Sequence, residues 1–175
     1  MRNSAFLGLG LALLLIQSNL FRLVGALNLA GATPSLLLPL VLFMGVHEYS
    51  VARGAALSFA LGYLLDVCAA APIGLYTFNS VAIFVVSRAA GVRLAAQTLP
   101  TKIALGFIFS LLEGLIVIIL TAIFGDDPAR PPALGLLAVP HAVATAICAP
   151  LVFRAAERVH QATTNVLRPG EARGR

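Results

Sequence analysis

Charged residues are scarce in this chain of 175 residues, at 11% of the sequence, against about 25% in typical soluble domains. Apolar residues make up 59%, and the mean hydropathy is +0.95. A water-soluble domain of this length has too little interior to hide so much apolar surface, so the lipid bilayer is the expected solvent. The composition predicts one all-α integral membrane domain over residues 1–158, followed by a basic cytoplasmic tail over residues 159–175.

Groupings of residues that would carry chemistry are also missing. The two cysteines, Cys68 and Cys148, lie far apart and form no Cys/His spacing that is typical of a metal site. The sequence contains no glycine-rich phosphate loop and no plausible Ser–His–Asp set. The net charge of +5 comes from scattered basic residues rather than from a basic stripe with interleaved aromatics. We therefore expect no catalytic, cofactor or metal site, no enzymatic activity and no nucleic-acid partner.

Apolar segments separated by Pro, Gly and charged residues predict six transmembrane helices, since a crossing takes about 20 residues. The predicted spans cover residues 4–24, 34–50, 54–69, 73–91, 101–124 and 134–156. Pro39 and Pro140 fall inside two of these spans and are expected to kink them. The uncharged core of the third span, residues 54–65, is short enough to be a re-entrant segment instead.

Basic residues are distributed unevenly between the two sides that six spans define. With the N-terminus in the cytoplasm, all but Arg22 and Arg130 of the 12 lysine and arginine residues lie on the inner side. This positive-inside bias predicts that both termini are cytoplasmic. A re-entrant hairpin over residues 54–91 would pass the same test. A cleaved signal peptide is the alternative for the first segment, although polar residues interrupt it before the possible cleavage site at Val24-Gly25-Ala26.

Asp66 is an acidic residue that ends an otherwise uncharged apolar run. It belongs to the stretch Gly62-Tyr63-Leu64-Leu65-Asp66, which is followed after five residues by Pro72-Ile73-Gly74-Leu75. Placing a carboxylate at mid-bilayer costs roughly 3 kcal/mol, so such a residue is a candidate for function. The structural alternative is that Asp66 marks the point where a helix leaves the bilayer. We interpret Gly62, Asp66, Pro72 and Gly74 as one shaped turn that holds its own structure or contacts a partner.

Glu113 lies near the middle of the fifth apolar segment and is expected to face the bundle. His141 is a possible partner for it, as are Tyr63 and Asn79. The functional interpretation is an ion pathway, and the structural one is an interhelical hydrogen bond. His47 at the end of the second span is expected to lie at the membrane interface.

The stretch from Gly62 to Leu75 resembles the most recognisable sequence of the bacterial rod shape-determining protein MreD family. The resemblance assigns Gly62, Asp66, Pro72 and Gly74 to the family motif, and chain length and membrane character also fit. It implies a six-helix transmembrane bundle similar to the substrate-binding subunits of energy-coupling-factor transporters. It also implies a non-enzymatic inner-membrane component of the cell-elongation machinery.

The resemblance further implies the partners of the chain. The direct partner is MreC, which links to the class B penicillin-binding transpeptidase and the RodA glycosyltransferase, and MreB filaments lie on the cytoplasmic side. The expected function is a scaffold that supports peptidoglycan synthesis and cell shape. Two alternatives remain open, a substrate-binding subunit of a vitamin transporter and an ion-conducting protein that uses Glu113.

Overall fold

The computed structural model describes residues 2–26, 33–47, 50–69, 72–90, 98–124 and 130–165. Over these ranges the chain is helical and contains no strand, which confirms the all-α prediction. The helices are α1 (Arg2–Ala26), α2 (Leu37–His47), α3 (Val51–Ala69), α4 (Leu75–Ala89), α5 (Leu99–Phe124) and α6 (Arg130–Asn165).

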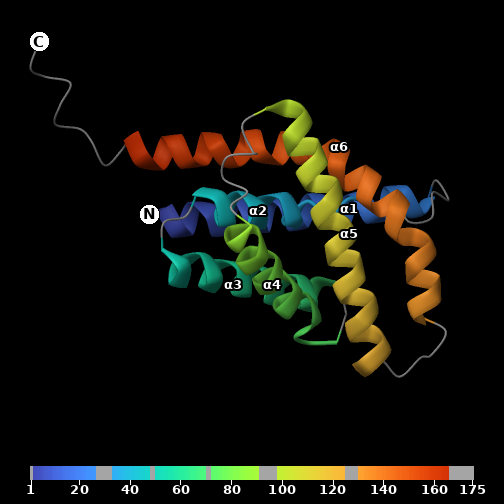
Figure 1. Cartoon of the computed structure of the whole chain (residues 1–175). Helices are drawn as coiled ribbons and strands as arrows, with labels where there is room; N and C mark the ends of the chain where they lie inside the picture. The colour runs from blue at the N-terminus through green and yellow to red at the C-terminus, as the bar shows by residue number, and fades with distance from the viewer. Residues whose placement is uncertain are drawn as a thin grey trace, which may run out of the picture.

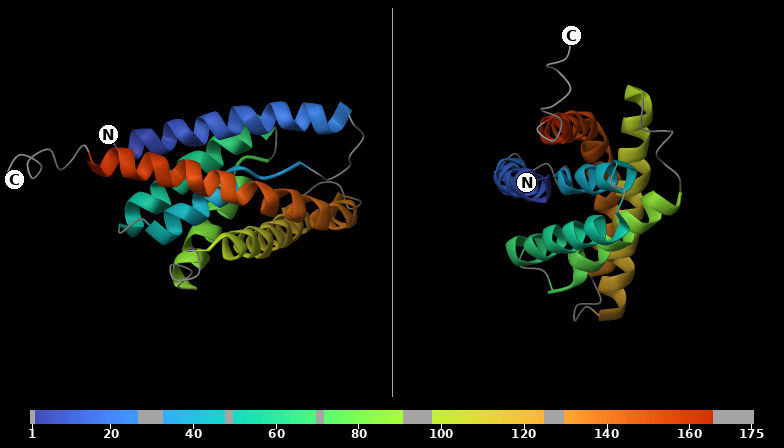
Figure 2. Two further views of the ribbon diagram at one scale, coloured as in Figure 1. Left: turned by 90° about the horizontal axis from the view of Figure 1, so that it is seen from above. Right: turned by 90° about the vertical axis from the view of Figure 1, so that its left-hand side faces the viewer.

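The bundle is arranged around α2, which contacts each of the other five helices. Every residue from Leu37 to Val46 is buried, as expected for a helix that is apolar on all sides. α3 and α4 form one antiparallel pair and α5 and α6 another, while α1 runs beside α6 and α5 crosses the bundle steeply (Figures 1 and 2). The N-terminus and the C-terminal end of α6 lie at the same end of the bundle (Figure 1).

Three of the helical segments are long and apolar enough to cross a membrane, namely Val51–Ala69, Leu99–Phe124 and Gly135–Thr163. The segment at 54–69, which the sequence left open as re-entrant, thus lies in a helix of spanning length. Three further apolar helices are shorter, namely Ser4–Leu20, Leu37–His47 and Leu75–Ala89.

α6 extends beyond both ends of the predicted span at 134–156, whereas α2 is shorter than the predicted span at 34–50. α2 has 11 residues, or a length of about 17 Å at 1.5 Å per residue, so its helix alone does not cover a hydrocarbon core of about 30 Å. Residues 33–36 precede it as a non-helical segment, which is buried over residues 34–36. Backbone outside a helix is tolerated at such a place only where the protein itself provides hydrogen-bonding partners.

The two prolines that were expected to kink helices behave differently. Pro39 falls in the first turn of α2, where its missing N–H breaks no helical hydrogen bond, so the expected interior kink does not arise. Pro140 and Pro150 both lie inside α6. That helix changes direction along its length in Figure 1, as interior prolines favour.

Candidate functional site

The Asp66 carboxylate forms hydrogen bonds within the chain. It lies in the last turn of α3, is 1% exposed, and accepts from the backbone N–H groups at the start of α4. Its Oδ1 accepts from Tyr76 N at 2.7 Å, and its Oδ2 accepts from Gly74 N at 2.9 Å and Thr77 N at 3.1 Å. The Thr77 hydroxyl also donates to Oδ2, at 2.6 Å. Asp66 therefore caps α4, whose N-cap residue, Gly74, lies eight residues after Asp66.

Asp66 provides the side-chain cap that the N-cap residue of α4 cannot provide. The residue at the N-cap position is Gly74, which has no side chain to accept from the first N–H groups. A carboxylate at a helix N-terminus is also favoured by the helix dipole. Because four donors surround Asp66, its negative charge is compensated although the side chain is buried.

Gly62 and Gly74 serve this geometry in different ways. A Cβ atom on Gly62 would lie 2.7 Å from both Thr77 Cα and Tyr76 O, so α3 and α4 are in backbone contact there. Gly74 has φ 105°, a left-handed conformation that side chains disfavour. Pro72 precedes it, and the Pro72 carbonyl accepts from Leu75 N at 3.2 Å. The structure brings Gly62, Asp66 and Gly74 together against the first turn of α4.

The outer surface of this turn is apolar. Ile73 is 77% exposed, while Val67 and Phe78 are each 59% exposed. The polar atoms of Asp66 point inward at the same place. Anything that approaches the turn from outside therefore meets aliphatic and aromatic side chains rather than the carboxylate.

Glu113 forms a second buried polar cluster, in the middle of the bundle. Its Oε1 accepts from Asn79 Nδ2 of α4 at 3.3 Å and from Ser35 Oγ, just before α2, at 3.4 Å. His141 Nε2 of α6 lies 4.0 Å from Oε2. Of the possible partners considered from the sequence, Asn79 and His141 are at this site, whereas Tyr63 lies on an exposed face of α3.

The same cluster holds the beginning of α2. Ser35 N donates to Thr145 Oγ1 of α6 at 2.9 Å, and Leu36 N donates to Gln17 Oε1 of α1 at 3.0 Å. The first N–H groups of a helix have no partner within it, and side chains of two other helices provide acceptors for the N–H groups just before α2. Ser35, Thr145 and Gln17 were not identified as partners from the sequence, because each contacts a segment far away in the chain.

A small cavity adjoins Glu113. It has a volume of about 10 Å³ and is lined by α2 leucines together with Asn79, Ser80 and Glu113. Ligand pockets for small molecules occupy about 300–1,000 Å³. This cavity is therefore far too small for the vitamin that the transporter alternative requires.

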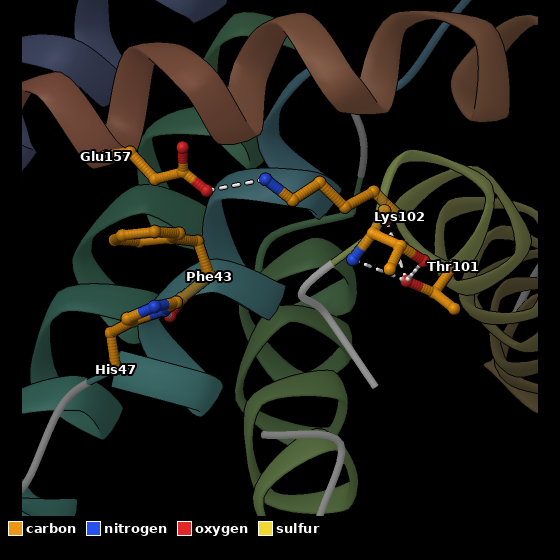
Figure 3. A network of polar contacts seen from close by, with 6 residues as sticks. Phe43, His47, Thr101, Lys102 and Glu157 are labelled. Atoms are coloured by element: carbon orange, nitrogen blue, oxygen red, sulfur yellow. Dashed lines mark hydrogen bonds and ion pairs between the residues drawn. The ribbon is translucent and has the colours of Figure 1, made fainter. Parts of the chain in front are cut away.

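Aromatic rings and one ion pair join the opposite end of the bundle. The Phe43 ring stacks on His47 with centroids 4.1 Å apart, and it contacts His160 of α6. Lys102 Nζ, at the start of α5, lies 2.6 Å from Glu157 Oε1 of α6 (Figure 3). His47 thus packs against Phe43 at the end of α2, and its place at the membrane interface stays a prediction. The Lys102–Glu157 pair was not predicted.

Part of the predicted basic tail, residues 166–175, lies outside the described residues. The first part of the predicted tail, up to Asn165, continues α6. Among the residues described, no group of three or more His, Cys, Asp or Glu side chains is arranged to hold a metal ion.

Comparison of the chain with models of protein families, with curated proteins and with solved structures finds no match.

Proposed function

We propose that this chain is an MreD-like scaffold of the bacterial inner membrane that binds MreC and supports peptidoglycan synthesis during cell elongation. The observation that carries the proposal is the connection among the motif residues. Gly62 and Asp66 on α3 both meet Thr77, and Asp66 binds the backbone of Gly74. Residues that resemble a family motif in sequence thus form one contact in space.

The proposal includes six crossings with both termini in the cytoplasm, and a fold similar to the energy-coupling-factor subunits. Basic residues support this orientation, because many of them lie at the helix ends on the side of Lys102 and Glu157. These are Arg53 early in α3, Arg88 late in α4, and Arg154 and Arg158 late in α6. The Asp66 turn is then at the periplasmic end.

The proposed mechanism assigns Asp66 an indirect role. Its hydrogen bonds hold the turn in one conformation, and the turn presents Ile73, Val67 and Phe78. The transmembrane span of MreC would pack against this apolar surface, with van der Waals contact supplying the affinity. RodA, the transpeptidase and MreB filaments would be reached through MreC.

Co-purification of MreC tests this account. We expect Ile73→Ala to lower the amount of MreC recovered, while Ile147→Ala leaves it unchanged. Ile147 is a matched control, since it is 67% exposed but lies on α6. Membrane insertion of both variants is checked by fractionation.

Two results would contradict the proposal at different levels. Equal recovery of MreC with both variants would remove the turn from the interface. Failure of the unaltered chain to recover MreC, together with a stoichiometric vitamin in native mass spectrometry, would favour the transporter subunit instead.

A further inference from the structure

Two buried oxygen atoms on residues that line the small cavity have no hydrogen-bond partner. They are Asn79 Oδ1 and Glu113 Oε2. Asn79 is 1% exposed and Glu113 is 8% exposed, so bulk solvent does not satisfy them. A buried acceptor without a donor costs about 1–3 kcal/mol, and most such atoms in proteins are paired, often with an ordered water.

The orientation of the Asn79 amide is set by its neighbour. Its Nδ2 donates to Glu113 Oε1 at 3.3 Å. Turning the amide over would place its oxygen against that carboxylate oxygen, with two acceptors facing each other. Oδ1 must therefore be satisfied by a donor from elsewhere.

His141 does not supply a donor to the second oxygen at hydrogen-bonding distance. Its Nε2 is 4.0 Å from Glu113 Oε2, which is longer than the 2.7–3.2 Å range of an N–H···O hydrogen bond. The rest of the cavity lining is aliphatic apart from the hydroxyl of Ser80, and it includes Leu37, Val41 and Ile83.

We propose that this cavity binds one water molecule, which donates one hydrogen to Asn79 Oδ1 and the other to Glu113 Oε2. The cavity volume of about 10 Å³ is close to the minimum of roughly 10–15 Å³ that a single water requires. A divalent cation fits poorly, because Mg²⁺ and Ca²⁺ take about six or more oxygen ligands, whereas the lining offers side-chain oxygens from three residues, Asn79, Ser80 and Glu113. The water links α4 to α5 beside α2 and completes the Glu113 cluster.

Radiolytic hydroxyl labelling of the full chain in lipid nanodiscs tests for this water, because a bound water generates hydroxyl radicals next to buried side chains. We expect labelling of Ile83 in the unaltered chain, and little labelling of Leu61, which is 0% exposed and does not line the cavity. Asn79→Leu removes one acceptor and should lower Ile83 labelling several-fold. Ser110→Ala should not, since Ser110 is equally buried but lies outside the cavity lining.

An electron-microscopy map of the unaltered chain that resolves waters provides the second measurement, and it does not depend on the folding of a variant. Density for one water within hydrogen-bonding distance of both oxygens supports the proposal. An empty cavity, or Ile83 labelling as low as that of Leu61, overturns it. Density that disappears when sodium is replaced by a large organic cation also overturns it, in favour of a monovalent cation.

Discussion

Asp66 is a single buried side chain that connects the end of α3 to the start of α4. From the sequence it is an acidic residue next to a turn, and either a partner-facing role or a structural one is consistent with that position. In the fold, its two oxygens accept from three backbone N–H groups and one hydroxyl at the start of α4. The residue was identifiable from its rarity, whereas Thr77, its closest partner, was not, because a threonine near a helix start is common.

Replacing Asp66 should destabilise the α3–α4 contact. Asp66→Ala leaves the N–H groups of the first α4 turn without acceptors, and we expect a loss of about 2–4 kcal/mol in the free energy of unfolding. Asp66→Asn should lose less, because one oxygen remains to take the three Oδ2 contacts while its amide group opposes Tyr76 N–H. Reversible unfolding in mixed detergent measures both variants.

The informative result is which of the two variants has the lower free energy of unfolding. An unfolding free energy for Asp66→Ala equal to that of the unaltered chain would mean that the cap contributes nothing. Asp66→Asn falling below Asp66→Ala would show that the new donor repels more than the remaining oxygen stabilises.

At the scale of helices, the sequence indicated where most elements begin and end, since Pro, Gly and charged residues interrupt the apolar runs. It was less accurate for α6, which extends from Arg130 to Asn165, and for α2, whose helix is limited to Leu37–His47. Residues 34–36 belong to the predicted span but are not helical, and the backbone N–H groups of Ser35 and Leu36 donate to the side chains of Thr145 and Gln17. Such bonds join segments far apart in the chain, and no local pattern encodes them.

The α3–α4 contact depends on the absence of a side chain at Gly62. Gly62→Ala would bring a methyl group to 2.7 Å from backbone atoms of Thr77 and Tyr76, which forces the helices apart and costs about 1–3 kcal/mol. Gly8→Ala is the matched control on α1, where a Cβ meets nothing within 4 Å and alanine improves helix propensity. We expect thermal unfolding to shift downward for the first variant and to stay level or rise for the second. Equal shifts would show that the close contact carries no energetic weight.

At the scale of the whole molecule, the expected topology makes a prediction about the two sides of the membrane. In a background with Cys68 and Cys148 replaced by alanine, we introduce one cysteine at a time, as Ile73→Cys at the turn or as Gln161→Cys near the end of α6. Both positions are exposed. A membrane-impermeant maleimide applied to intact spheroplasts should label the first, and should label the second only after permeabilisation.

Other labelling patterns would identify which part of the topology is wrong. Labelling of both cysteines from outside would place the end of α6 on the outer side of the membrane. It would contradict the expectation that the chain crosses an even number of times and has both termini in the cytoplasm. Protection of the Ile73→Cys position from both sides would favour a re-entrant or partner-covered hairpin over residues 54–91.

The sequence by itself determined the helical class, the presence of helices apolar enough to cross a membrane and the approximate helix positions, because these follow from composition and from the placement of breakers along the chain. It also singled out Asp66 and Glu113, since charge within apolar segments is costly and therefore rare. Only the tertiary structure decided what these carboxylates bind. Their partners lie on other helices, at Gly74, Tyr76 and Thr77 for Asp66 and at Ser35 and Asn79 for Glu113, and hydrogen bonds over 2.6–3.4 Å require the helices to be packed before a donor and an acceptor can meet.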